Sequence, residues 1–269
     1  MYSVSDLHAV DAHWLDTPSH PILRAGEPHV WRASLDLSAP RLAVLYATLS
    51  SDERARAARF HFDRDRNHFI AARGLLRELL GSYVNRAPAS LCFAYGQRGK
   101  PSLAAPESAA SLPIRATQSE TPPQAGELRF NLSHSHGLTL FAFARGTELG
   151  VDVEHIRLDF ATNEIAERFF SPPERAALRA LPAAQRAEGF FNCWTRKEAY
   201  IKATGDGLSI PLDSFDVTLA PGQPARLLAV RGTPDAAIRW SMWALTPASG
   251  FVAALLVARS SPPALFDLG

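Results

Sequence analysis

Apolar residues recur along this chain with two different spacings, and each spacing predicts a different element. Between residues 69 and 80 they fall three and four positions apart, which predicts an amphipathic helix. The same spacing predicts a longer helix over residues 183–203, with Gly205 placed to end it. Short apolar runs, several of them alternating, predict strands at residues 29–37, 91–95, 128–132, 138–144, 149–154, 215–219, 226–230, 239–245 and 251–258.

Two helix starts and a short repeat indicate how these elements are organised. Residues 171–174 read Ser-Pro-Pro-Glu, which has the form of a capping box, and Ser51 is a candidate cap for a helix that follows it. The tripeptide Glu-Arg-Ala at residues 53–55 recurs at residues 174–176. Strands and helices follow each other in runs, so we expect an α+β fold. The repeat favours two similar α+β halves with a site between them.

Residues 102–126 differ from the rest of the chain. They are rich in Pro, Ser and Ala and lack apolar periodicity. We interpret them as a long surface loop, whose role the sequence does not indicate. The first 28 residues allow no assignment. We place the boundary between an N-terminal half, residues 1–145, and a C-terminal half, residues 146–269.

Composition narrows the class of protein. The chain has 269 residues, 46% of them hydrophobic, and a formal net charge of +1. So small a charge gives no global field for nucleic acid or a membrane surface. Two cysteines make no disulfide framework, and we find neither a signal-peptide pattern nor an apolar run long enough to span a bilayer. We therefore expect a cytoplasmic monomer that binds neither nucleic acid nor membrane.

Residues 150–154, Gly-Val-Asp-Val-Glu, are the first candidate for chemistry. In a strand Asp152 and Glu154 point to one face, and Val151 and Val153 to the other. Two carboxylates side by side repel each other unless a cation joins them, and Mg²⁺ prefers such hard oxygen ligands together with phosphate. The alternative is an ordinary half-exposed strand with acidic outward positions, which the pattern alone favours.

A second candidate lies on the long helix. Trp194, Glu198 and Lys202 are spaced four apart and share one face. Glu198 and Lys202 could form a simple surface pair, but Trp194 on the same face indicates partial burial. A buried glutamate and lysine require partners, which a metal ion and a phosphate would supply.

Two further segments are less specific. Residues 130–137, Phe-Asn-Leu-Ser-His-Ser-His-Gly, are interpreted as a turn whose hydroxyls and imidazoles could hold phosphate, or as an ordinary polar hairpin loop. A zinc site at His134 and His136 is poorly supported by their spacing. Residues 99–101, Gly-Lys-Pro, form a basic turn. The chain contains no Walker loop, dinucleotide fingerprint or nucleophile elbow.

Taken together and in order, these segments resemble the Sfp-type 4′-phosphopantetheinyl transferases. Each segment alone is weak evidence for the family. The ordered set is specific, and the resemblance spans residues 29–257. The matching segments are residues 99–101, 130–134, 150–154, 168–171 (Arg-Phe-Phe-Ser), 194–199 (Trp-Thr-Arg-Lys-Glu-Ala), Lys202 and 207–215 (Gly-Leu-Ser-Ile-Pro-Leu-Asp-Ser-Phe).

The resemblance implies a fold, a ligand and residue roles. The family fold has two similar α+β halves related by a pseudo-twofold, with coenzyme A in the cleft between them. By resemblance, Mg²⁺ would be held by Asp152, Glu154 and Glu198, and Lys202 would reach a phosphate of the same pyrophosphate. The adenosine end, chiefly its 3′-phosphate, would be held by Arg56, Lys100, Ser133 and His134.

The implied reaction is Mg²⁺-dependent transfer of 4′-phosphopantetheine from coenzyme A to a serine of an apo acyl or peptidyl carrier protein. Adenosine 3′,5′-bisphosphate would leave, and Glu198 would take the serine proton directly or through water. Carrier docking is expected through apolar contacts around residues 165–171. The carrier and its pathway are not indicated. In one departure from the family, His68 stands where an Arg is common, which puts one nucleotide contact in doubt. The alternatives are an inactive carrier-binding paralogue and another Mg²⁺-dependent nucleotide-diphosphate transferase.

Overall fold

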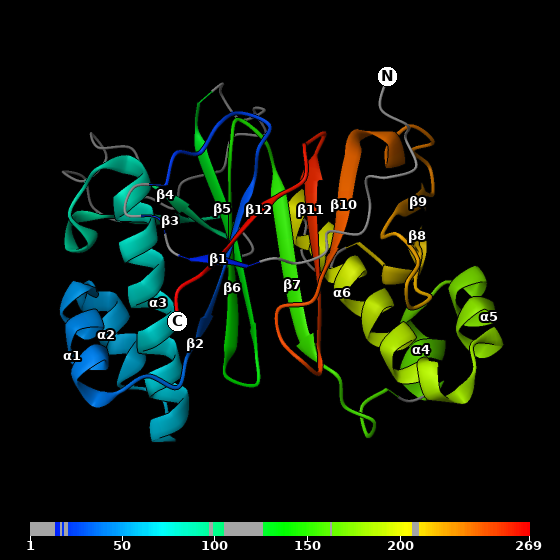
Figure 1. Cartoon of the computed structure of the whole chain (residues 1–269), viewed down its shortest axis with the longest axis horizontal. Coiled ribbons are helices and arrows are strands. Elements are labelled where there is room, and N and C mark those ends of the chain that lie inside the picture. Colours follow the sequence, from blue (N-terminus) through cyan, green and yellow to red (C-terminus); the bar gives the residue numbers. More distant parts are fainter. Residues whose placement is uncertain are drawn as a thin grey trace.

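The computed structural model places two small β-sheets side by side between two groups of helices (Figure 1). Helices α1 to α3 cover one side and α4 to α6 the other. It describes residues 14–16, 18, 21–96, 99–104, 126–161, 163–205 and 210–269. The predicted α+β class is confirmed, whereas the pseudo-twofold relation between the halves stays a prediction. Among the described residues no helix is long and apolar enough to cross a membrane.

The first group of elements builds a five-stranded sheet in the order β1-β12-β2-β6-β5. Strand β6 pairs antiparallel with both β2 and β5, which places β5 at an edge. The bounds are β1 Leu15–Asp16, β2 His29–Ser34, α1 Ala39–Thr48, α2 Ser51–Ala57, α3 Asp63–Val84, β3 Phe93–Tyr95, β4 Pro101–Leu103, β5 Leu128–Ser135 and β6 Leu138–Arg145.

The second group builds a three-stranded sheet in the order β10-β11-β7, so β7 also lies at an edge. Strand β12 then returns to the first sheet, where it runs parallel between β1 and β2. The bounds are β7 Leu149–His155, α4 Asn163–Phe169, α5 Pro172–Ala180, α6 Arg186–Thr204, β8 Phe215–Val217, β9 Leu227–Val230, β10 Trp240–Leu245, β11 Phe251–Ala258 and β12 Ala264–Asp267.

Strand alternation directs the apolar side chains of each sheet into different hydrophobic clusters. In β6, Phe141 and Phe143 pack toward α3, while Leu140 and Ala142 face the second sheet. In β7, Val151 and Val153 join that central core and are almost fully buried. Because successive strand residues point to opposite faces, the intervening Asp152 and Glu154 turn the other way, toward α6.

Several predicted boundaries require correction. Helices α1 and α4 and strand β12 were not expected, because each is short and lacks a clear periodic pattern. The N-cap of α2 is Ser50, not Ser51, and α3 extends past the predicted residues 69–80 at both ends, with Asn85 in the left-handed conformation as its C-cap. The predicted loop at 102–126 begins with two residues of β4, and its residues 105–125 lie outside the described part of the chain.

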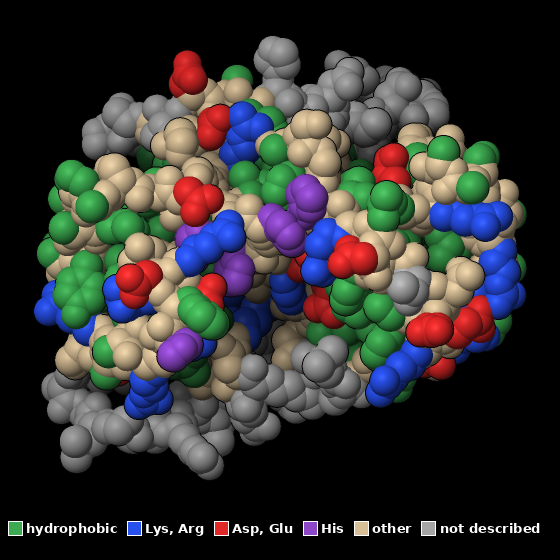
Figure 2. Space-filling view, turned by 90° about the horizontal axis from the view of Figure 1, so that it is seen from below, with side chains coloured by type: hydrophobic (Ala, Val, Ile, Leu, Met, Phe, Trp, Pro, Cys, Tyr) green, Lys and Arg blue, Asp and Glu red, His purple; other side chains and the backbone are tan. Residues whose placement is uncertain are grey.

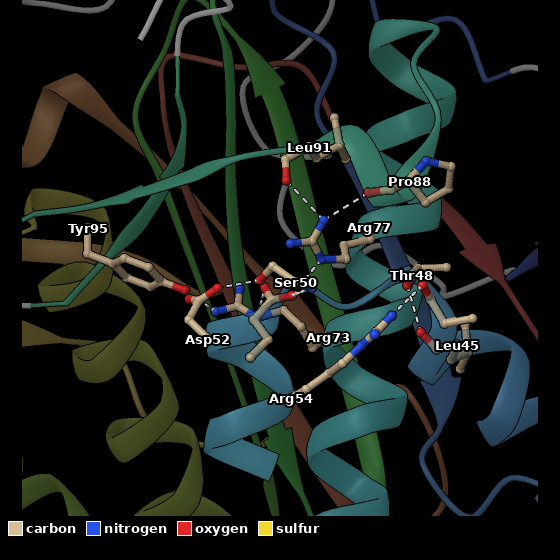
Figure 3. Close-up of polar contacts among 12 residues, drawn as sticks. Leu45, Thr48, Ser50, Asp52, Arg54, Arg73, Arg77, Pro88, Leu91 and Tyr95 are labelled. Carbon is tan, nitrogen blue, oxygen red and sulfur yellow. Dashed lines mark hydrogen bonds and ion pairs between the residues drawn. The ribbon is translucent and has the colours of Figure 1, made fainter. Parts of the chain in front are cut away.

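A buried ion pair occurs in both groups of elements and supports the internal repeat. In the first, the capping-box residue Glu53 of α2 pairs with Arg77 of α3 at 2.7 Å. Arg77 also donates to the carbonyl oxygens of Pro88 and Leu91 (Figure 3). Its guanidinium lies over the Phe93 ring, at the start of β3. The pair thus ties two helices to the segment that follows them.

The second group repeats the arrangement. The capping-box residue Glu174 of α5 pairs with Lys197 of α6 at 2.8 Å, and both side chains are buried. Lys197 donates to the carbonyl oxygens of Leu212 and Phe215 and lies over the Phe215 ring, at the start of β8. The Glu-Arg-Ala repeat in the sequence therefore marks a repeated structural device.

Acidification below about pH 6.5 should destabilise the protein through His29. This ring is 3% exposed, and its Nδ1 lies 2.7 Å from the Tyr83 hydroxyl, which already accepts from Trp31 Nε1. Burial lowers the His29 pKa from 6.5 to about 4. The unfolded chain therefore binds a proton at higher pH than the folded one, so stability is complete above pH 6.5 and falls as pH drops toward 4, by up to about 3 kcal/mol.

The test is the free energy of unfolding measured in denaturant between pH 4.5 and pH 8. Asparagine at position 29 can still accept a hydrogen bond from Tyr83 but does not titrate. The His29→Asn variant should therefore lose less of its unfolding free energy between pH 6.5 and pH 4.5 than the wild type does. An equal pH dependence in both proteins would contradict the assignment.

Candidate functional site

Two adjoining cavities lie beside strand β5. The first lies between the two groups of elements, and the second lies within the first group. The first, which we call the carboxylate cavity, has a volume of about 420 Å³ and is lined by Leu132, Ser133, His134, Asp152, Glu154, Trp194, Glu198 and Lys202. The second, the arginine cavity, has a volume of about 600 Å³ and includes Arg56, Arg64 and Arg73 in its wall. Leu132 and His134 line both, so the two cavities are neighbours that share part of one wall. Histidine and basic side chains gather around a hollow on this face (Figure 2).

The edge strands β5 and β7 meet through side chains, without backbone pairing between them. Alternate residues of β5 accept hydrogen bonds from alternate backbone amides of β7, always 20 residues further along the chain. A constant offset means that the two strands run parallel here. The backbone amides of β7 donate these hydrogen bonds over 2.9, 3.3 and 3.2 Å, from Val151 to Asn131 Oδ1, from Val153 to Ser133 Oγ and from His155 to Ser135 Oγ, respectively.

Two of these β5 side chains also hold the carboxylates. Ser133 Oγ donates to Asp152 Oδ1 at 2.8 Å, and Ser135 Oγ donates to Glu154 Oε2 at 2.8 Å. Each hydroxyl therefore binds a β7 carboxylate with its proton and the next β7 amide with its lone pair. The spacing of the two serines matches the spacing of the two acids, which orients both acids toward the cavity.

Helix α6 brings the remaining groups because it packs against β7 at Gly150. A Cβ atom at this position would lie 2.1 Å from the Ala199 carbonyl oxygen, so only glycine permits the contact. The helix presents Glu198 and Lys202 to the carboxylate cavity. Lys202 Nζ lies 2.6 Å from Asp152 Oδ1 and 3.0 Å from Ser133 Oγ. The predicted shared face of Trp194, Glu198 and Lys202 is confirmed, since all three line this cavity.

The carboxylate cavity carries excess negative charge. Among the described residues, three carboxylates and one ammonium line it. Burial raises the pKa of Glu198, and the charge of Asp152 adds to the effect. Burial likewise raises the pKa of Glu154, again with a contribution from Asp152. A cation bound in this cavity would offset the repulsion between the carboxylates and favour their ionised forms.

The chemistry of these donors fits Mg²⁺. Within the described part of the chain, Asp152 Oδ2 is buried and has no hydrogen-bond partner. A buried carboxylate oxygen with no partner is costly unless a ligand satisfies it. No group of three His, Cys, Asp or Glu among the described residues is arranged to hold a metal by itself. Mg²⁺ commonly takes one or two carboxylates and completes its shell with substrate phosphate and water, which agrees with this arrangement.

The arginine cavity combines basic groups with an apolar wall. Arg56 lies over the Phe69 ring at 5.3 Å, and Phe60, Tyr95 and Leu132 add further apolar surface. A wall of this kind suits a planar aromatic base, and the cations suit its phosphates.

Two histidines lie in the wall of the arginine cavity. His134 reaches both cavities, and loss of solvent, then the charges of Lys202 and His68, lower its pKa. His68, which departs from the family pattern, lies 2.7 Å from Asp36 Oδ1.

Two of the four predicted adenosine contacts, Ser133 and Lys100, do not line the arginine cavity. Ser133 is 7% exposed and bonds to Asp152 and Lys202, so it belongs to the carboxylate cavity. Lys100 does not line either cavity, although its neighbours Gly99 and Pro101 do. Arg56 and His134 both lie in the wall of the arginine cavity, and their role toward adenosine stays a prediction.

The sequence interpretation missed three positioning residues and misassigned one segment. Strand β5 continues beyond its predicted end at residue 132 to Ser135, so only His136 and Gly137, both at positive φ, form the turn. The polar residues Asn131 and Ser135 therefore point to β7, and Gly150 admits α6. The alternation of Asn, Ser and Ser at every second position was the available signal.

The comparisons with known proteins point in one direction. Residues 148–256 match the family model of the 4′-phosphopantetheinyl transferase superfamily, and residues 36–145 match that of the 4′-phosphopantetheinyl transferase N-terminal region. The 4′-phosphopantetheinyl transferase HetI of Nostoc sp. is 40% identical over 245 residues, which cover 91% of this chain and 93% of the relative. The 4′-phosphopantetheinyl transferase Sfp of Bacillus subtilis is 29% identical over 64% of this chain and 66% of its own length.

Solved structures give weaker matches. The holo-(acyl-carrier-protein) synthase from Bacillus anthracis, in complex with CoA (3′,5′-ADP), is 21% identical, with a TM-score of 0.34, and the match covers 42% of this chain and 96% of that one.

Proposed function

This chain belongs to the 4′-phosphopantetheinyl transferase family, and from this premise we propose that it transfers 4′-phosphopantetheine from coenzyme A to a serine of an apo acyl or peptidyl carrier protein, with Mg²⁺. The observation that carries the proposal is the junction of the two cavities. A site for a diphosphate and a cation adjoins a site for a base and a further phosphate, which is the layout of a 3′-phosphoadenosine diphosphate. The nucleotide thus rests mainly on residues 1–145, and the reacting groups mainly on residues 146–269.

We assign Asp152, Glu154 and Glu198 to the Mg²⁺ ion. Bound there, it would neutralise charge on the pyrophosphate and on the leaving oxygen. The protein supplies orientation: Ser133 and Ser135 hold two of the carboxylates in place through hydrogen bonds of 2.8 Å. Lys202 is aimed into the same cavity and can donate to a phosphate oxygen.

The transfer itself requires one proton acceptor. The serine oxygen of the carrier forms a bond to the β-phosphorus of coenzyme A as the bond to the bridging oxygen of adenosine 3′,5′-bisphosphate breaks. Glu198 takes the serine proton, directly or through water. Burial raises its pKa, so it is a stronger base than an exposed glutamate.

The carrier needs a surface beside the carboxylate cavity. The predicted docking segment, residues 165–171, requires a correction, because Phe170 and Ser171 are buried in the core. Accessible apolar groups in or near this segment include Leu158, which is 82% exposed, and the half-buried Ile165 and Phe169. We assign carrier docking to these three residues, with the protein acting as a monomer.

Incubation with coenzyme A, Mg²⁺ and a panel of apo carrier proteins tests the proposed function. We expect at least one carrier to gain the mass of phosphopantetheine on its serine, with release of adenosine 3′,5′-bisphosphate. Carrier binding without a mass change would instead favour an inactive paralogue. Consumption of another nucleotide diphosphate, with no carrier modified, would favour a different transferase.

The arginine cavity should determine the preference for the 3′-phosphate. We expect Arg56→Met and His134→Ala each to raise KM for coenzyme A and to narrow its preference over 3′-dephospho-coenzyme A, with kcat little changed, because these contacts are remote from the reacting phosphorus. Arg59→Met is the matched control, since Arg59 is exposed and outside the cavity wall. If both cavity variants prefer coenzyme A over 3′-dephospho-coenzyme A as strongly as the wild type does, the 3′-phosphate binds elsewhere.

A further inference from the structure

Lys100 directs its side chain away from the arginine cavity. It lies in the turn between β3 and β4, and both of its neighbours line that cavity. Its ammonium instead donates to the carbonyl oxygen of Lys202 at 2.8 Å and pairs with Glu148 Oε2 at 3.2 Å. The carbonyl oxygens of Ala203 and Leu149 lie within 3.4 Å. An ammonium has three donors, and four acceptors from this chain already surround it.

The carbonyl groups that Lys100 contacts belong to the last turn of α6. The last four carbonyls of a helix have no partner within the helix, and a cation near them is favourable. Helix α6 ends at Thr204, followed by Gly205 in the left-handed conformation. Lys100 therefore caps this helix from a turn that lies 102 residues earlier in the chain.

The capped turn is the one that carries Lys202. Its backbone carbonyl binds Lys100, and its side chain reaches Asp152. The same turn of the helix is held against β7 at Gly150, where an added Cβ would lie 2.5 Å from the Ala203 amide nitrogen. The end of α6 is thus held both by the second sheet and by the β3–β4 turn.

We propose that Lys100 is a positioning residue that clamps the end of α6 and so fixes Lys202 for the transfer, and that it is not a contact to the 3′-phosphate of coenzyme A. This inference rests on the proposed function, because it assigns Lys202 to the transfer. The segment 99–101 therefore contacts both parts of the site. Gly99 and Pro101 line the arginine cavity, and Lys100 binds the end of α6, the helix that carries Lys202.

Kinetics of Lys100→Met with two substrates distinguish the roles. A clamp predicts that kcat falls roughly 10- to 100-fold with both coenzyme A and 3′-dephospho-coenzyme A, because a small displacement of Lys202 is costly. The preference between the two substrates should stay as in the wild type. Lys100→Arg, which keeps a cation with several donors, should recover most of the activity. Arg56→Met is the comparator in which the preference is expected to narrow.

Hydrogen exchange supplies a readout that does not depend on turnover. Backbone amides at residues 200–204 should exchange at least about fivefold faster in Lys100→Met than in the wild type, with exchange in α3 unchanged. If the methionine variant does not fold, Lys100→Gln serves in both measurements.

Either of two results would overturn the clamp: a raised KM with a narrowed substrate preference and normal kcat, or unchanged exchange at the end of α6. If the wild type modifies no carrier, the proposed function fails, while the exchange measurement still decides the clamp.

Discussion

Glu198→Gln should lower the rate of phosphopantetheine transfer by roughly 10²- to 10⁴-fold, and further if a metal ligand is lost as well. The carboxylate lies in the same cavity as Asp152 and Glu154, and we propose it as the base that takes the serine proton. Glutamine keeps the shape of the side chain but cannot accept that proton. The measurement is kcat for carrier modification at saturating coenzyme A and Mg²⁺.

The same substitution should leave the fold intact and raise its stability. Burial and the charge of Asp152 raise the pKa of Glu198, so its ionised form costs folding free energy at neutral pH. Glu188→Gln, the same change on the same helix but outside the carboxylate cavity, should alter neither activity nor stability appreciably. If kcat of Glu198→Gln lies within tenfold of the wild-type value, Glu198 is not the base that takes the serine proton.

Lys197→Met should destabilise the protein by about 3–5 kcal/mol, the usual cost of leaving one member of a buried ion pair alone. Lys197 is 1% exposed, and its ammonium holds Glu174 together with the carbonyl oxygens of Leu212 and Phe215. Its removal leaves a buried carboxylate without its cation. The measurement is the free energy of unfolding in denaturant.

A double-mutant cycle separates the pair from simple loss of packing. Adding Glu174→Gln to Lys197→Met removes the uncompensated charge and should restore part of the stability. The surface pair of Arg175 and Glu167 is the matched control, and Arg175→Met should cost no more than about 1 kcal/mol. If the loss of unfolding free energy in the double variant equals the sum of the losses in the two single variants, the two charges do not stabilise each other.

Local periodicity predicted the elements that carry the site. The alternation in residues 150–154 placed Asp152 and Glu154 on one face of a strand, and the four-residue spacing placed Trp194, Glu198 and Lys202 on one face of a helix. Both patterns depend only on neighbours in the sequence. The resemblance to a family was needed to bring the two elements together, because periodicity carries no information on which elements meet.

Contacts between distant segments were beyond sequence reasoning. Ser135 holds Glu154 because β5 lies beside β7, which follows from tertiary packing and not from either strand alone. Lys100 was assigned to coenzyme A through the family resemblance alone, whereas its ammonium binds the backbone at the end of α6. Strand β12 is four residues long and follows a Ser/Pro-rich segment, so its pattern was too short to predict.

The return of β12 to the first sheet has a consequence for synthesis on the ribosome. Residues Ala264–Asp267 lie between β1 and β2, so the first sheet lacks an inner strand until more than a hundred residues after β6 have been added. At about 5–20 residues per second this delay is several seconds or longer. During that time the edge of β2 and the Trp31 ring, which later stacks on Phe266, have no partner strand. Nascent chains therefore carry an open sheet edge, which chaperones can bind, until the residues of β12 have been added.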